Sequence, residues 1–299
     1  FIILKDVHLS SSIQTYFWVA FFIPFVTKML MFPFHNWMLD KHVIGPIGTT
    51  VMLSCSVANL GGYGFLRLSF SLLPEATVFF APFMMFLGVL FAIYGTAIVI
   101  SFKSFKGLVL CLVFTQTGLI LLGMFSLNEQ GIQGAIIKIL SHSAVTAGLI
   151  ICLNILFERF KLGQEFQIRK LLNNTPRYLV LNILLLLAVI GVPGTSGFIG
   201  NFLIVLGAFE HSLIVSVFVF IILILLIIDV LYIYQHIIFG NVVAFNKSSS
   251  EDLSRHELVV LLPITCLVFW IGVYPIPFLE VISLSAESIT KSLILISGD

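Results

Sequence analysis

Four ionisable side chains lie inside long apolar stretches of the sequence: Lys28, Lys138, His142 and Asp229. Placing a charged side chain in hydrocarbon costs several kcal/mol, so such residues are rare there and usually serve a function. Low dielectric destabilises the charged form of a lysine, which lets a neighbouring carboxylate or entering water switch its charge. The four residues are therefore candidates for a proton relay inside a membrane.

Each candidate also has a structural interpretation. Lys28 could instead hydrogen-bond the carbonyls of an interrupted helix. Lys138 and His142 stand at i and i+4 on one helical face. This spacing is as consistent with a hydrogen-bonded relay as with a structural contact between helices. Asp229 is the only acid deep in a span, and it either pairs with a lysine on another helix or faces a partner chain.

The elements that must position these residues are membrane-spanning helices. Apolar residues make up 59% of the chain and charged residues only 10%, with a mean hydropathy of +1.14, whereas an ordinary soluble domain is about 25% charged. Apolar stretches reach the roughly 20 residues that a spanning helix needs. We therefore expect an all-α, polytopic membrane protein with about eight transmembrane helices in a single membrane domain over residues 1–299. The expected spans are residues 15–38, 47–67, 77–101, 106–126, 131–157, 178–207, 213–239 and 257–274.

The basic residues predict an orientation for these spans. Loops on the side reached after the first span hold ten Lys and Arg residues, whereas the opposite side holds only Lys5, Arg67 and Lys291. Basic loops stay on the matrix or cytoplasmic side of a membrane. Eight spans then place both termini on the outer face.

One span contains a run that cannot be regular helix, with Gly191, Pro193, Gly194 and Gly197 in seven residues. Proline lacks an N–H donor, and glycine permits a positive φ. Backbone groups freed at membrane depth need protein or water partners, so such breaks usually line a polar cavity. The first span is interrupted by two prolines, Pro24 and Pro33, and paired interruptions are typical of inverted-repeat transporters. The alternative is that the prolines only kink their helices.

Other classes of site find little support. The net charge of +1 gives no basic field for nucleic acid. The four cysteines lie singly in apolar stretches without a CxxC or Cys/His cluster, so we expect buried free thiols and no metal: Cys55, Cys111, Cys152 and Cys266. The absence of a Rossmann-type glycine loop or cysteine set predicts no flavin, iron–sulfur or nicotinamide cofactor in this chain. Thirty phenylalanines hint at an A/T-rich organellar gene.

Several motifs together resemble one family. The run at 32–37 (FPFHNW), the run at 60–67 (LGGYGFLR), Ile139-Leu140-Ser141-His142 and the run at 192–200 (VPGTSGFIG) follow in the order seen in subunit 4 of NADH dehydrogenase, an antiporter-like membrane subunit of respiratory complex I. The resemblance covers about residues 16 to 280. It implies a fold with fourteen helices and two inverted five-helix repeats, of which this chain begins at the seventh helix. A separate polypeptide would then supply the helices before it.

The resemblance also assigns roles to residues. Lys28 matches the essential lysine of the first half-channel, and His142 matches the histidine of the central axis. Three other relay positions carry neutral side chains here: Asn59 where a lysine is usual, Gln116 where a histidine is usual, and Asn201 where a glutamate is usual. Amides can order a water wire but do not hold and release a proton. Lys138 and Asp229 are then candidates to substitute for the lost groups.

The resemblance implies a non-redox, proton-translocating subunit of NADH:ubiquinone oxidoreductase in the mitochondrial inner membrane. Expected partners are lipid and the membrane-arm subunits of the subunit 2 and subunit 5 types, and both termini would face the intermembrane space. Two alternatives stay open. The chain could be a structural subunit that no longer pumps, which the neutral replacements favour, or a subunit of a multi-subunit cation/proton antiporter, which shares these motifs.

Overall fold

The computed structural model describes residues 9–31, 34, 47–101, 105–160, 175–239 and 252–297, and all regular structure within them is helical. This confirms the all-α fold class. The elements are α2 (Ser11–Lys28), α4 (Ile47–Met52), the π-helical turn η1 (Leu53–Val57), α5 (Ala58–Gly64), the π-helical turn η2 (Phe65–Ser69), α6 (Phe70–Leu72), α7 (Pro74–Ser101), α8 (Phe105–Phe125), α9 (Glu129–Phe160), α10 (Pro176–Ile190), α11 (Ser196–His211), α12 (Leu213–Phe239), α13 (Arg255–Val273) and α14 (Ile276–Ser297).

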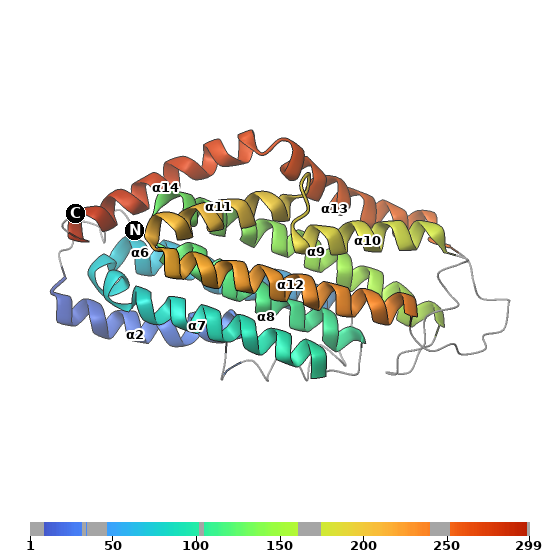
Figure 1. Ribbon diagram of the computed structural model, residues 1–299, viewed down its shortest axis with the longest axis horizontal. Helices are drawn as coiled ribbons and strands as arrows, with labels where there is room; N and C mark the ends of the chain where they lie inside the picture. The colour runs from blue at the N-terminus through green and yellow to red at the C-terminus, as the bar shows by residue number, and fades with distance from the viewer. Residues whose placement is uncertain are drawn as a thin grey trace.

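The helices run along the long axis of an elongated bundle, and the start of α2 and the end of α14 lie at the same end of it (Figure 1). Helices α10 and α11 follow one another end to end, and so do α13 and α14 (Figure 1). Each pair therefore runs along the bundle as two helices separated by a break. The segment from α4 to α6 is likewise one helix, in which two π-helical turns are inserted.

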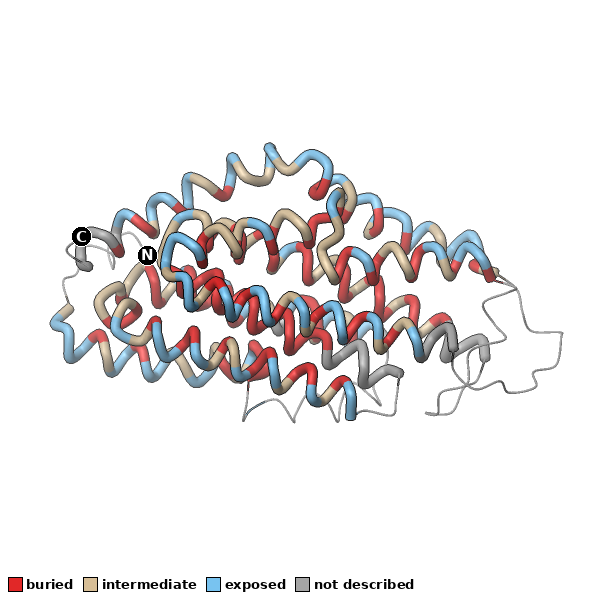
Figure 2. The backbone as a smooth tube through the Cα atoms, in the orientation of Figure 1, coloured by how far each residue is buried: buried red, intermediate tan, exposed pale blue. Residues whose placement is uncertain are grey.

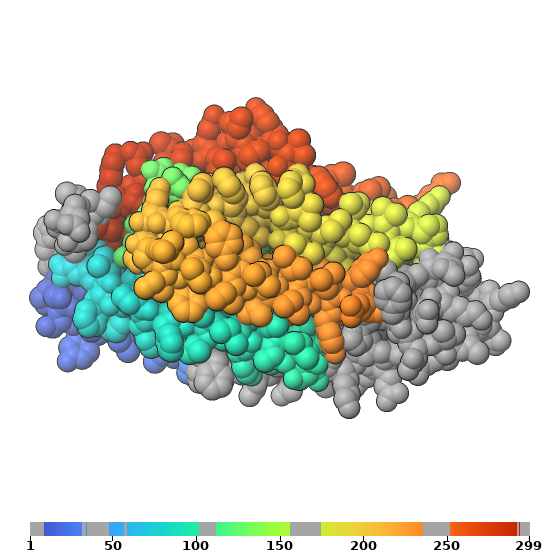
Figure 3. Space-filling view, viewed as in Figure 1, coloured from blue at the N-terminus to red at the C-terminus, as the bar shows by residue number. Residues whose placement is uncertain are grey.

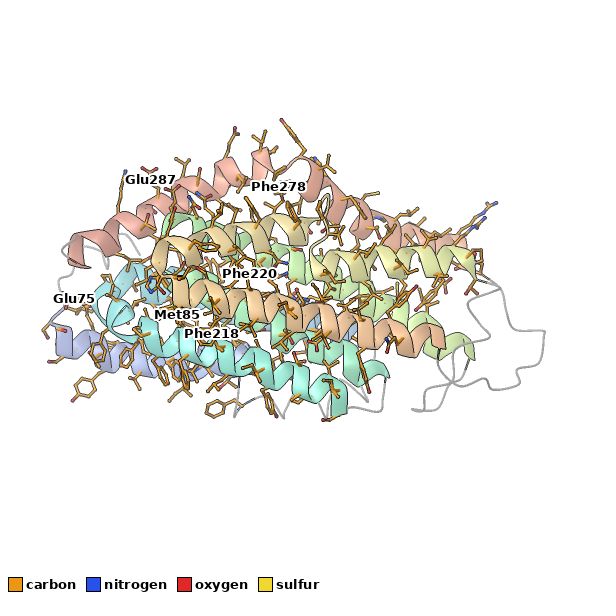
Figure 4. The ribbon with its side chains drawn as sticks, in the orientation of Figure 1. Glu75, Met85, Phe218, Phe220, Phe278 and Glu287 are labelled. Atoms are coloured by element: carbon orange, nitrogen blue, oxygen red, sulfur yellow. The ribbon has the colours of Figure 1, made fainter. Side chains whose placement is uncertain are left out.

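The bundle carries the apolar surface of a membrane protein. In the part of the chain that the structure describes, four helices are long and apolar enough to cross a bilayer: Pro74–Ser101, Glu129–Ile155, Leu213–Gln235 and Arg255–Val273. Helix α12 lies across the near face between α7 and α11 (Figure 3), and it alternates between buried and exposed residues (Figure 2). Its exposed side chains include Phe218 and Phe220 (Figure 4). Such an outward apolar belt is what lipid contact requires.

Helix α9 is the central element, in contact with α4, α5, α8, α10, α11, α13 and α14. Helix α2 lies at the margin and is attached by aromatic stacking. The Trp18 ring stacks on Phe80 of α7 with centroids 4.2 Å apart and lies 6.3 Å from the ring of Phe65 in η2. Gly61 of α5 allows the approach, because a Cβ there would collide with Met29 and the Phe25 carbonyl.

One expected span was placed wrongly. The first, 15–38, was too long at its C-terminal end, because α2 ends at Lys28 and Leu30 follows with φ of +61°. Pro24 lies inside α2 and does not end it, while Pro33 lies outside the described residues. The last expected span, 257–274, agrees with α13, and a further helix, α14, follows the break at Tyr274. Serines and charged residues along α14 weaken its apolar signal, so hydropathy alone misses it.

Candidate functional site

The interruption predicted at 191–197 is present between α10 and α11. Helix α10 ends at Gly191, whose φ of +84° is the left-handed cap conformation, and Gly194 follows with φ of +92°. A side chain with a Cβ is strained at both positions. Asn201 of α11 reaches back over the break, its Nδ2 donating a 3.1 Å hydrogen bond to the freed Ile190 carbonyl. Gly197 packs directly against the carbonyl of Ala188, so the two helix ends stay close together.

Helix α9 presents polar side chains to its neighbours at the same depth as this break. Ser141 Oγ lies 2.8 Å from Ser196 Oγ at the start of α11. On the other side, Ser143 Oγ accepts a hydrogen bond from Asn59 Nδ2 of α5. Between them His142 is buried, with Nδ1 3.2 Å from Thr146 Oγ1. One helix therefore joins the polar groups of α5 to those of the broken helix.

Lys138 lies one turn before His142 and is fully buried. Its backbone packs on Gly200 of α11, where an added Cβ would stand 3.1 Å from the Lys138 Cα. Gly200 precedes Asn201 in sequence. Lys138 thus lies against the segment of α11 that carries Asn201, one of the three neutral replacements.

Asp229 of α12 is also fully buried, which excludes the expectation that it faces a partner chain. Its Oδ2 accepts hydrogen bonds from Thr115 Oγ1 of α8 at 2.8 Å and from Thr96 Oγ1 of α7 at 3.2 Å. The described partners of this carboxylate are therefore hydroxyls and not a lysine. Thr115 precedes Gln116, so the carboxylate of Asp229 packs against α8, the helix that carries the second neutral replacement.

Several buried polar atoms in this region have no hydrogen-bond partner among the described residues. They are Lys138 Nζ, His142 Nε2, Gln116 Nε2, Asn201 Oδ1 and Asp229 Oδ1. Buried polar atoms in proteins are almost always hydrogen-bonded to protein or to ordered water. Their concentration on α8, α9, α11 and α12 marks the polar centre of the bundle.

Lys28 differs from the other candidates. The apolar sequence around Lys28 predicts a buried charge, but within this chain the side chain of Lys28 is exposed, at the C-terminal end of α2. The reason is the marginal position of α2, whose extensive contacts are with α5, η2 and α7. A cation in the last turn of a helix is favoured by the helix dipole. The structure thus does not bring Lys28 into the polar centre formed by α9.

The sequence analysis missed one member of the site. Thr96 lies in the apolar run of α7, where a lone threonine is more often bonded to its own helix, and it also bonds the Ala92 carbonyl. Only packing reveals its contact with Asp229. Among the described residues no group of His, Cys, Asp and Glu side chains is arranged to hold a metal ion. Cys55 and Cys152 are buried thiols, Cys266 is exposed, and the Cys111 side chain lies outside the described residues.

Comparison with known proteins identifies the family. Residues 2–227 match the family model described as NADH:quinone oxidoreductase/Mrp antiporter, transmembrane. The chain is 33% identical over 289 residues to NADH-ubiquinone oxidoreductase chain 4 of Chondrus crispus, covering 97% of this chain and 59% of that protein. The resemblance to subunit 4 is thereby confirmed.

Solved structures agree with this fold. A chain of respiratory complex I from Thermus thermophilus superposes with a TM-score of 0.85 at 27% identity, covering 94% of this chain and 59% of that chain. A chain of the Mrp complex from Dietzia sp. superposes with a TM-score of 0.83 at 16% identity, covering 98% and 63%, and shows the fold alone. The chain spans about 59% of the length of the relatives that it matches. It belongs to the NADH:quinone oxidoreductase/Mrp antiporter transmembrane family.

Proposed function

We propose that this chain is a proton-translocating membrane-arm subunit of respiratory complex I in the mitochondrial inner membrane. The observation that carries the proposal is the set of polar contacts that α9 makes on its two sides. Asn59 on α5 bonds Ser143 of α9, and Ser141 of α9 bonds Ser196 at the helix break. His142 lies between these two serines in sequence and contacts Thr146. Complex I couples NADH oxidation to this translocation, and the redox cofactors belong to other subunits.

The titratable side chains of the polar centre are His142, Lys138 and Asp229. Histidine can accept a proton on one ring nitrogen and release it from the other, and a buried lysine or carboxylate changes charge with its surroundings. The amides at 59, 116 and 201 order water between these groups. The amides at 116 and 201 each have a titratable side chain nearby. Asp229 accepts a hydrogen bond from Thr115, the residue before position 116. Lys138 packs against Gly200, the residue before position 201. These neighbours take over the proton-holding role.

Lys28 acts together with further helices. Its exposure, and that of neighbouring apolar side chains on α2 such as Tyr16 and Ile23, leaves this face open for them. We propose that helices like those that precede this region in longer relatives cover the face and provide a carboxylate partner for Lys28. The neighbouring membrane-arm subunits of the 2 and 5 types are the other expected partners. The basic loops face the matrix, and both termini face the intermembrane space.

The test is proton stoichiometry in the reconstituted complex. We expect Lys138→Gln and Asp229→Asn each to lower the number of protons moved per NADH oxidised. The matched controls are Lys291→Gln and Glu280→Gln, which make the same charge changes at exposed positions on α14 and should leave the ratio unchanged. Ferricyanide reduction by NADH confirms that each variant complex is assembled. An unchanged ratio in both test variants would contradict the relay.

In the structural alternative, the chain has the same fold but does not translocate protons. The neutral side chains at Asn59, Gln116 and Asn201 favour it, and it predicts unchanged stoichiometry in every variant, His142→Gln included. The size and composition of the native complex distinguish the antiporter alternative from the complex I assignment. If this chain migrates on a native gel in a smaller complex without NADH-oxidising subunits, the complex I assignment fails.

A further inference from the structure

A groove on the surface of the bundle is not used by the proton relay. It lies between the helix of α5, η2 and α6 on one side, α9 at its floor and α14 on the other side. Its volume is about 390 Å³, within the range of small-molecule sites in proteins. Helix α14 forms the outer wall, where Figure 4 marks Glu287 on the same helix.

One part of the groove is apolar. Ile139 and Leu140 of α9 line it together with Val281 and Ile282 of α14. Leu140 and Val281 are 44% and 72% exposed, although both are large apolar side chains. In a bilayer such a surface is satisfied by hydrocarbon and has no need of a protein partner.

The other part of the groove is polar. It is lined by Arg67 of η2, Ser71 of α6, and Ser285 and Ser288 of α14. A guanidinium offers five N–H donors, enough to hold a phosphate besides any contact within the protein. Arginine binds phosphate oxygens in a bidentate geometry, and serine hydroxyls can add further hydrogen bonds.

The two parts are separated along the membrane normal. At 1.5 Å per residue, Arg67 lies about 8 Å from the end of its helix at Leu72, at the depth where phospholipid headgroups lie. Ile139 lies about 15 Å from the start of α9 at the same end of the bundle, well inside the hydrocarbon region. The groove therefore changes from polar to apolar over about 7 Å along the bundle.

We propose that this groove binds one anionic phospholipid, its phosphate held by Arg67 and the serine hydroxyls and an acyl chain lying along Ile139, Leu140 and Ile282. A guanidinium beside an apolar wall favours a lipid over a protein segment. Arg67, the cation among the residues that line the groove, selects an anionic lipid over a zwitterionic one. This inference does not depend on whether the chain pumps protons.

The test uses the intact purified complex and a phosphatidylglycerol that carries a photoreactive group on its acyl chain. We expect labelled peptides at 136–140 and 281–289. Arg67→Gln should lower this labelling about five-fold, the factor expected for one basic residue near a membrane surface. Arg255→Gln, which removes an exposed arginine on α13, is the matched control and should label normally.

A second variant fills the groove without altering its charge. Leu140→Trp should abolish labelling of these peptides, whereas Ile224→Trp, at an exposed position on α12, should not. If Arg67→Gln prevents assembly, competition on the unaltered complex decides the matter: unlabelled phosphatidylglycerol should displace the probe and phosphatidylcholine should not. Equal labelling by a phosphatidylcholine probe, or crosslinks from these peptides to another subunit, would overturn the proposal.

Discussion

Gly200 on α11 packs against the backbone of Lys138 on α9 so closely that an added Cβ would stand 3.1 Å from the Lys138 Cα. The contact brings the buried lysine beside the helix break and leaves no room for a side chain between the two helices. Because the obstacle is backbone, it cannot be relieved by a change of rotamer.

Gly200→Val should therefore separate α9 from α11. Overpacking of this kind costs about 1–3 kcal/mol. Thermal unfolding of the purified complex, followed by tryptophan fluorescence, should show a lower midpoint. Gly48→Val is the control, because a Cβ at Gly48 meets nothing within 4 Å. Equal midpoints for the two variants would contradict this account of the packing.

Trp18 should be the main attachment of α2. Its ring is 1% exposed and stacks on both Phe80 and Phe22. Trp18→Ala should lose about 3–5 kcal/mol of packing free energy. Tyr16→Ala on the same helix should cost far less, since Tyr16 is 78% exposed. Limited proteolysis of the region around α2 measures the difference, and similar cleavage rates in both variants would rule out the role given to Trp18.

Thr115 should stabilise the buried carboxylate of Asp229. Thr115→Val keeps the shape of the side chain but removes the 2.8 Å hydrogen bond to Oδ2. Leaving a buried acceptor with one partner fewer costs about 1–3 kcal/mol, more for a charged group. Thr15→Val, which removes an exposed hydroxyl bonded only within α2, serves as the control. In the double variant with Asp229→Asn the loss should shrink, and a loss of undiminished size would argue against the contact.

Asp252 should make the junction of α10 and α13 sensitive to acid. Its carboxylate accepts hydrogen bonds from the backbone N–H groups of Arg177 at 3.0 Å and Tyr178 at 3.3 Å, and so caps α10 from a distant segment. Slight burial acts to raise the pKa of this carboxyl. The bonds from Arg177, Leu253 and Tyr178 and the charge of Arg177 outweigh that effect, so its pKa lies below the ordinary value.

A carboxyl whose pKa is lower in the folded state than in the unfolded state stabilises the fold when it is ionised. This stabilisation is complete above the unfolded-state pKa of about 3.9, and it is lost as the pH falls through the folded-state pKa. Asp252→Asn removes the charge and keeps an acceptor, and should therefore cost about 0.3–1 kcal/mol at pH 7, the usual value of a negative charge at a helix N-terminus. The difference from the unaltered protein should narrow below about pH 4. Hydrogen exchange of the first turn of α10 across this range tests the prediction, with Glu280→Gln as the control. A difference that does not vary with pH would be contrary to it.

The sequence by itself determined the membrane class, the broken span and the position of the polar residues along α9. Those features are local: hydropathy depends on composition, a break depends on glycine and proline, and Lys138 and His142 share a face through helical spacing alone. The motif resemblance was equally readable, because it rests on the order of residues and not on their contacts.

Only the tertiary structure decided which helices meet. It placed Thr96 beside Asp229 although 133 residues separate them, set Lys138 against Gly200, and left Lys28 exposed on a marginal helix. The structure also revealed α14 after the break at Tyr274, a helix whose serines and charged residues weaken the apolar signal in the sequence. Hydropathy records how apolar a segment is, but the partners of a buried polar group depend on the approach of helices distant in sequence.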